Sequence, residues 1–113
     1  ELQQGYGGYD IPKILLVTTV DTRAYNNVDD RNLGYIDGGL FTMTLIYALE
    51  DKLIGACLLN TAFNIRKDLL IREEIGMNPY EIFINLIPVG KMLEETIVAN
   101  SSRVPVEEIL EIH

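Results

Sequence analysis

A long segment from Leu33 to Leu53 constrains this chain most, because its composition is that of a helix buried on several sides. Between Leu40 and Leu49 only Thr42 and Thr44 are polar, so apolar side chains surround the helix axis and do not form one stripe. A domain of 113 residues has little protein with which to cover such a helix. Its own sheet could bury one face. The other faces require a second subunit or a further part of the protein, and we expect a dimer interface along this helix.

The segments around the helix follow the order of a mixed α and β domain. Lys13 to Val20 is β-branched and almost continuously apolar, the pattern of a strand covered on both faces. A second helix is predicted from Asn64, a good N-cap, to Ile75, and a second strand from Glu81 to Val89. The two strands are expected to be neighbours. The predicted fold class is therefore α+β, close to α/β, with a small sheet packed on the long central helix.

Glycine and proline residues carry specific expectations about where these elements end and where they pack. Gly55 is predicted to cap the long helix in the left-handed conformation. Pro88 cannot donate to a ladder, so its end of the second strand is predicted to be a sheet edge or the last rung. Gly38 and Gly39 each disfavour helix by roughly 1 kcal/mol relative to Ala, which predicts tight helix packing or the close approach of a backbone or a ligand.

The two ends of the chain differ from its body. Residues 1–10 are rich in Gly, Gln and Tyr and predict a flexible N-terminal segment, whereas residues 11–113 form the domain itself. The chain begins at Glu1 and not at a methionine, which suggests a fragment. Near the C terminus, Pro105 and the glutamates after it predict one helical turn. The apolar residues of this tail are expected to pack across the dimer: Val104, Val106, Ile109, Leu110 and Ile112.

The charge of the chain argues against several classes of partner. Seventeen acidic and nine basic residues give a net charge of −8, which disfavours binding to nucleic acid or to an anionic membrane. The longest apolar stretch is far shorter than the roughly 20 residues needed to span a bilayer. Cys57 is the single cysteine, so no internal disulfide can form, and its apolar neighbours predict a buried small hydrophobe. We expect a cytoplasmic protein.

The sequence contains no conspicuous catalytic side chain. His113 is the terminal residue, and Asp29, Asp30 and Asp37 lack the spacing of a calcium loop, so we predict neither a catalytic residue nor a metal site. There is also no phosphate-binding loop of the Walker or dinucleotide type. An enzyme built from these residues would depend on a cofactor that carries the chemistry.

Four short motifs follow one another in a characteristic order. They are Tyr35–Leu40 at the helix start, Leu53–Cys57 after the helix, Val89–Gly90 at the end of the second strand, and Ser102–Arg103. This order resembles the C-terminal half of the FMN-dependent nitroreductase family, from about Ile11 to the end of the chain. The resemblance implies a partial nitroreductase-like domain that forms an intertwined homodimer with FMN at the interface. It also implies that NADH or NADPH reduces the flavin, which then passes electrons to nitro compounds, quinones or similar acceptors.

The resemblance implies a set of cofactor-binding residues. Arg103 would contact the FMN phosphate with Ser101 or Ser102 beside it, and a guanidinium fork suits a phosphate well. Leu58, Leu59 and Asn60 would lie along the flavin, where the amide can bond a ring or ribitol oxygen.

Two features differ from the family pattern. Ser101 occupies a position where the family often has a lysine, and the family's Arg-Ser-x-Arg-like element near the N terminus has no match here. The chain therefore resembles half of a flavin site. An alternative interpretation is a non-catalytic dimerisation or assembly module that has the same fold and lacks flavin.

Overall fold

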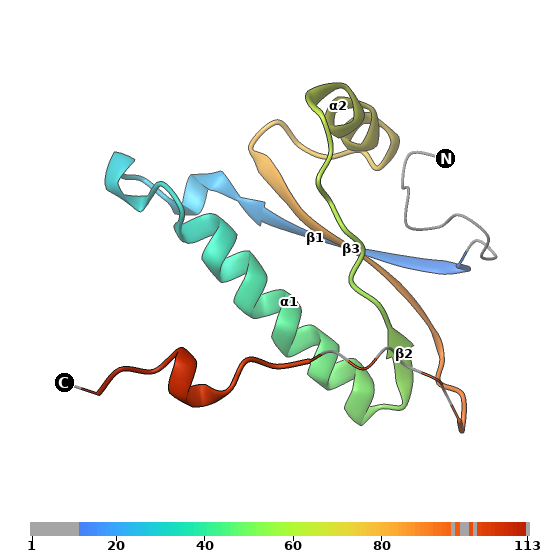
Figure 1. Cartoon of the computed structure of the whole chain (residues 1–113). Helices are drawn as coiled ribbons and strands as arrows, with labels where there is room; N and C mark the ends of the chain where they lie inside the picture. The colour runs from blue at the N-terminus through green and yellow to red at the C-terminus, as the bar shows by residue number, and fades with distance from the viewer. Residues whose placement is uncertain (1–11, 96, 98–99, 101, 113) are drawn as a thin grey trace.

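The part of the chain that the structure describes has a long α-helix and a short α-helix arranged around a small antiparallel sheet (Figure 1). The computed structural model describes residues 12–95, 97, 100 and 102–112. Its helices and strands are β1 (Ile14–Asp21), α1 (Leu33–Asp51), β2 (Ile54–Ala56), α2 (Ile65–Glu74) and β3 (Glu81–Lys91). This is the α+β arrangement expected from the sequence. The predicted flexible segment 1–10 lies outside the described residues.

β3 is the central strand of the sheet. The strand order is β1-β3-β2 and both pairs are antiparallel, so the two strands predicted from the sequence are neighbours. The prediction for Pro88 is wrong, because β3 continues to Lys91 and Pro88 pairs with Leu15. The Pro88 carbonyl accepts a hydrogen bond from the Cys57 N–H at 3.3 Å. In a ladder the N–H and C=O of one residue point to the same side, so the missing N–H faces Cys57, just beyond the end of β2.

A β-bulge interrupts the pairing of β1 with β3. Thr18 pairs with Asn85 and Thr19 pairs with Phe83, so Ile84 is the extra residue and has no partner on β1. A bulge of this kind bends its strand and increases the local twist. The Ile84 carbonyl points to the other edge of β3, as the carbonyls of Leu86 and Pro88 do, and the chain that follows β2 lies there.

Small residues form the face of α1 that packs on the sheet. Gly34, Gly38 and Thr42 are its buried residues, and their spacing of four places them on one face. A Cβ on Gly38 would lie 2.7 Å from Cγ1 of Ile84, so only glycine lets the helix come this close. The tight packing expected at the glycine pair is thus found at Gly38, where side chains of the sheet contact the helix. A Cβ on Gly39 would meet nothing within 4 Å.

A buried pair of hydroxyl groups ties α1 to β1. The Thr42 hydroxyl donates to the Gly38 carbonyl at 2.7 Å and lies 3.1 Å from the Thr18 hydroxyl. Because the Thr42 hydrogen is already used within the helix, the Thr18 hydroxyl is the donor to Thr42. Both threonines are therefore satisfied in the interior, as buried polar groups must be.

The opposite side of α1, which we call the outer face, is apolar and exposed. Its large side chains are between 41% and 64% exposed. They are Leu33, Ile36, Leu40, Met43 and Tyr47. Their spacing alternates between three and four residues, which is the pattern of a helix seam that packs against a second helix. The sheet covers only one face of α1, as expected.

The chain leaves α1 through a turn that the sequence did not predict. Helix α1 ends at Asp51, and Leu53 takes the left-handed conformation with a φ of 55°. The prediction of Gly55 as the helix cap is wrong, because Gly55 pairs with Gly90 inside strand β2. The earlier turn at Leu53 leaves enough chain for this third strand.

Helix α2 begins and ends as the sequence predicts. The Asn64 side chain caps it by accepting a hydrogen bond from the Lys67 N–H at 3.0 Å, and Gly76 follows it with a φ of 67°. Arg72 pairs with Asp68 at 2.7 Å and also donates to the Glu81 carbonyl at 2.7 Å. This arginine therefore holds α2 at the start of β3.

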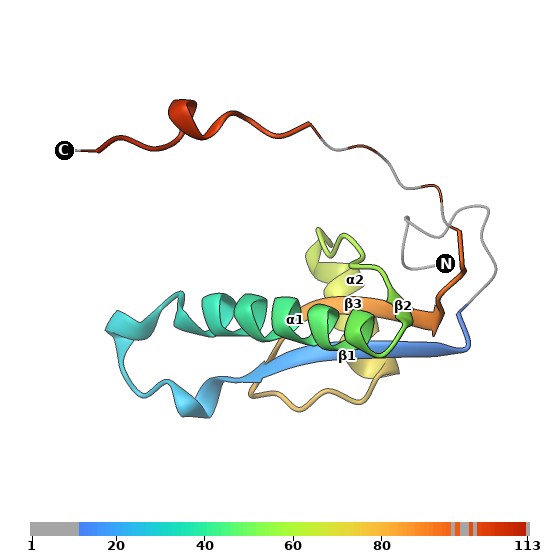
Figure 2. The same ribbon diagram turned by 90° about the horizontal axis from the view of Figure 1, so that it is seen from below.

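A C-terminal arm, residues 102–112, extends away from the helix and sheet (Figure 2). It contains one short turn, Val106–Glu108, for which Pro105 is the N-cap. The apolar side chains of the arm are more than half exposed, at Val104, Val106, Ile109, Leu110 and Ile112.

Candidate functional site

The segment after β2 lies along the edge of β3 and keeps the register of β2. The Cys57 N–H donates to the Pro88 carbonyl at 3.3 Å, and the Leu59 N–H donates to the Leu86 carbonyl at 3.0 Å. Two residues further on, the Thr61 hydroxyl donates to the Ile84 carbonyl at 3.2 Å. We call Cys57–Thr61 the edge segment. It is attached to the central strand at every second residue.

This attachment places the three predicted flavin-contacting residues side by side. Leu59 is half-buried and bonds β3 through its N–H, whereas Leu58 is 45% exposed and Asn60 is exposed. Alternate residues of an extended chain point their backbone groups to opposite sides, so the N–H groups of Leu58 and Asn60 point away from β3. The side-chain oxygen of Asn60 accepts from the Ala62 N–H at 2.9 Å, which fixes the turn after the segment.

The predicted phosphate-contacting residues lie on a different part of the chain. Ser102 and Arg103 are exposed and belong to the C-terminal arm. Figure 2 shows the arm apart from the edge segment, so the structure does not bring the two predicted groups together within one copy of the chain. Ser101 lies outside the described residues.

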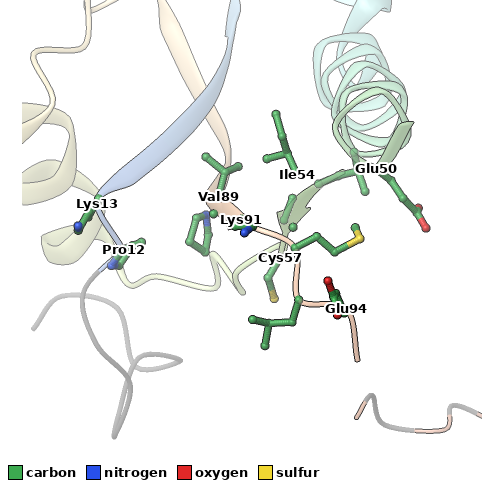
Figure 3. Close-up of a pocket in the computed structure, with 15 residues that line it drawn as sticks. Pro12, Lys13, Glu50, Ile54, Cys57, Val89, Lys91 and Glu94 are labelled. Atoms are coloured by element: carbon green, nitrogen blue, oxygen red, sulfur yellow. The ribbon is translucent and has the colours of Figure 1, made fainter. Parts of the chain in front are cut away.

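A cleft of about 940 Å³ lies beside the edge segment, where β1 begins and β3 ends (Figure 3). Ligand sites commonly have volumes of roughly 300–1,000 Å³. The cleft is lined by Pro12, Lys13, Ile46, Glu50, Ile54–Cys57 and Pro88–Glu94. Its lining contains none of the described residues that were predicted to bind the cofactor, but it includes Cys57, the neighbour of Leu58.

Two lysines in the cleft were not predicted as site residues. Figure 3 shows Lys13 and Lys91 among its lining, with Glu50 on the opposite wall. The sequence holds no signal for this, because each lysine stands alone beside a strand end. Only the pairing of β1 with β3 brings the two strand ends to one place.

The prediction that Cys57 is a buried hydrophobe is wrong. Its side chain is exposed and lines the cleft. The sequence showed an apolar run, but Cys57 lies just beyond the end of β2 at the edge of the sheet, where no further strand covers it. Its thiol lies 3.8 Å from the Leu58 carbonyl, a weak contact.

A polar cluster at the other end of β1 joins the ends of β1 and β3. Arg23 pairs with Asp21 at 2.6 Å and its guanidinium lies 3.6 Å from the centre of the Tyr80 ring. The hydrogen bond from Arg23 lowers the pKa of Asp21. Backbone and side-chain hydrogen bonds from Asn78, with one from Thr19, lower the pKa of Glu81. These contacts stabilise the charged forms and have a structural role, away from the edge segment.

A hydrogen bond joins the loop before α1 to the helix itself. The Tyr25 hydroxyl donates to Asp37 at 2.7 Å, and this bond raises the pKa of Tyr25. It fixes the loop against the first turns of α1.

Neither a metal-ligand cluster nor a membrane-spanning helix is found in the part of the chain that the structure describes. No group of His, Cys, Asp and Glu there is arranged to hold a metal ion. None of the helices described is both long and apolar enough to cross a bilayer.

Two solved structures resemble the chain over most of its length. One is a candidate NADH dehydrogenase/NAD(P)H nitroreductase from Parabacteroides distasonis, with a TM-score of 0.66 and 20% sequence identity over 81% of this chain. The other is a nitroreductase family protein from Streptococcus pneumoniae, with a TM-score of 0.61 and 27% identity over 80% of this chain. No protein-family model and no curated protein matches the sequence.

The chain accounts for only part of each similar structure. It spans 52% of the first and 42% of the second. The likeness to these structures confirms the fold that the order of motifs predicted. The chain is a nitroreductase-like α+β unit that corresponds to part of a nitroreductase family protein.

Proposed function

We propose that this chain is part of an FMN-dependent NAD(P)H oxidoreductase of the nitroreductase type. The observation that carries the proposal is the edge segment, which fixes the exposed residues Leu58 and Asn60 beside the central strand of a nitroreductase-like fold. Leu58 offers exposed apolar surface and Asn60 an exposed amide. An apolar surface with a few placed polar groups is what a planar ring with polar edges requires.

The flavin would supply the redox chemistry, accepting a hydride from NADH or NADPH and passing electrons to nitro or quinone-like acceptors. The chain's own residues would bind and orient the ring and exclude water. Leu58, Leu59 and Asn60 would lie along the ring. This assignment gives none of the described residues a catalytic role.

Arg103 would hold the phosphate, with Ser102 and Ser101 as hydroxyl donors beside it. Arg103 is exposed on the arm, and the planar fork of a guanidinium suits a phosphate. The residues present fit half of such a site. Ser101 supplies no charge where the family often has a lysine, and the remaining contacts would come from a further part of the protein or from a second copy.

We also propose that two copies associate through the outer face of α1. Five large apolar side chains repeat there at alternating spacings of three and four, which suits self-pairing of the helix. The exposed apolar side chains of the C-terminal arm would pack on the partner. Homodimerisation would remove the apolar surface of the outer face and of the arm from water.

The cellular partners follow from the proposed chemistry. NADH and NADPH are supplied inside cells, so the cytoplasm is the expected location. The net charge of −8 argues against binding to nucleic acid or to an anionic membrane surface.

A second candidate function is a non-catalytic dimerisation or assembly module. The observation that favours this function is the limited coverage of the similar structures. The chain spans only 52% of one and 42% of the other, so it corresponds to part of each. The exposed outer face of α1 would serve this function without flavin.

An FMN titration distinguishes the two candidates. Fluorescence quenching would be measured for the wild-type chain, Arg103→Ala, Arg103→Lys and the control Arg66→Ala, which removes an exposed arginine of α2. Hydrogen bonds to charged groups contribute about 1.5–3 kcal/mol, so Arg103→Ala should weaken binding roughly 10- to 100-fold. Arg103→Lys should lose less FMN affinity than Arg103→Ala, and Arg66→Ala should lose none. Unchanged FMN affinity in Arg103→Ala would show that Arg103 is not part of the site. A wild-type chain without FMN affinity would contradict the oxidoreductase proposal and favour the assembly module.

A further inference from the structure

We infer that Thr61 is the positioning residue of the candidate flavin site, because its hydroxyl attaches the end of the edge segment to β3. The role of Thr61 at a flavin site rests on the proposed function. The inference adds a residue that lies outside the predicted set of flavin contacts.

The hydroxyl of Thr61 takes the place of a backbone donor. Cys57 and Leu59 use their N–H groups to bond the carbonyls of Pro88 and Leu86, and the same register leads to Ile84. At this third position the bond comes from the Thr61 side chain, at 3.2 Å. The backbone turns away from the sheet here. The Ala62 N–H donates to the side-chain oxygen of Asn60, and the Phe63 N–H donates to the Thr61 carbonyl. The hydroxyl thus keeps the segment attached at the point where its backbone leaves the sheet.

The acceptor of this bond is the carbonyl of the bulged residue of β3. Ile84 has no partner on β1, and its carbonyl points to the edge segment. On the helix side, the Ile84 side chain lies against Gly38, where a Cβ would come within 2.7 Å of it. Ile84 is therefore held by α1 on one face and by Thr61 at the edge. The position of the edge segment is linked in this way to the packing of the long helix.

Two attachment points bracket the exposed residue Asn60. Leu59 precedes it with a bond of 3.0 Å and Thr61 follows it with a bond of 3.2 Å. Without the Thr61 bond, the segment beyond Leu59 would no longer be attached to β3 and would be free to move. Valine at position 61 keeps the branched shape and removes the donor, whereas serine keeps the donor. These two substitutions separate the hydroxyl from the shape of the side chain.

Amide hydrogen exchange measured by NMR tests the attachment without any flavin. The variants are Thr61→Val, Thr61→Ser and the matched control Thr44→Val, which removes a hydroxyl bonded within α1 at 2.9 Å. A lost bond of about 1 kcal/mol predicts roughly five- to tenfold faster exchange of the Leu59 N–H in Thr61→Val. Thr61→Ser and Thr44→Val should match the wild type at Leu59. Unchanged protection of Leu59 in Thr61→Val would overturn the inference, and Thr61→Ala repeats the test if the valine variant does not fold.

The visible circular dichroism of bound FMN tests the positioning. At saturating FMN, Thr61→Val should alter the flavin bands and Thr61→Ser should restore them. Arg103→Ala should weaken binding and leave the bands of the bound fraction in place. Flavin bands that are the same in Thr61→Val and wild type would overturn the positioning role. A wild-type chain that binds no FMN would overturn the proposed function, and the exchange of Leu59 would still decide whether Thr61 holds the segment.

Discussion

The side chain of Ile84 on β3 fills the space beside Gly38 of α1 that a Cβ would occupy in any other residue. Such a Cβ would lie 2.7 Å from Cγ1 of Ile84 and 3.0 Å from Cγ2 of Val20. Interiors are close-packed, so this contact sets the distance between helix and sheet. Since Ile84 is also the bulged residue that accepts the Thr61 hydroxyl, the same contact supports the candidate site.

Alanine substitutions at the two adjacent glycines should have opposite effects. Gly38→Ala forces a methyl group into Ile84 and should destabilise the chain by about 1–3 kcal/mol. Gly39→Ala meets nothing within 4 Å and should stabilise it by up to about 1 kcal/mol, through helix propensity. Urea denaturation followed by circular dichroism measures both. Equal effects of the two substitutions would contradict the packing described for Gly38.

The buried pair Thr18 and Thr42 should behave as one unit. Thr42→Val leaves the Thr18 hydroxyl without its acceptor and should cost about 1–3 kcal/mol of unfolding free energy. The double substitution, Thr18→Val with Thr42→Val, should cost less than the sum of the two single changes. A double-mutant cycle in urea measures this coupling. Strictly additive costs would show that the two hydroxyl groups do not interact.

Charged substitutions on the outer face of α1 should separate association from folding. Leu40→Asp and Met43→Asp place carboxylates in the proposed helix seam and should shift the chain to a monomer, as seen by sedimentation velocity. Leu45 lies seven residues after Gly38 and is half-buried, so it shares the sheet-facing side of α1. We expect Leu45→Asp to unfold the chain. Sedimentation unaffected by Leu40→Asp would argue against the seam.

The stability of the sheet should fall in acid partly through Glu81. Hydrogen bonds from Asn78, followed by one from Thr19, lower the pKa of Glu81 in the folded chain. A lowered folded-state pKa means that this contribution is complete above the ordinary pKa of an unfolded glutamate. It is lost as the pH falls through the lowered value. Thermal unfolding of Glu81→Gln should therefore depend less on pH in this acidic range than that of the wild type. Parallel curves for the two proteins would exclude Glu81 as a contributor.

Much of the fold follows from local sequence signals. The apolar run of α1, the β-branched pattern of β1 and the Asn64 cap each act over a few residues, and each predicted its element within one or two residues. The failures at Gly55 and Pro88 have one cause. A third strand beginning at Ile54 places both residues inside the sheet, and this pairing with β3 joins segments far apart in the sequence.

The candidate site was predictable only where a family motif marks it. The motif order predicted Leu58 and Asn60 as flavin contacts, and the structure adds that both residues are exposed. Thr61 belongs to none of the motifs. Sequence reasoning missed it because its hydroxyl bonds the bulged residue Ile84, which lies 23 positions further along the chain, in β3. The lysines of the cleft are likewise brought together only by strand pairing.

The most direct test of the account is reconstitution of the purified chain with FMN, followed by desalting and anaerobic addition of NADH or NADPH. The account predicts that flavin absorbance is retained after desalting and bleaches when the nicotinamide is added. A colourless protein after desalting would contradict the flavin site in this chain and leave the dimerisation module as its function.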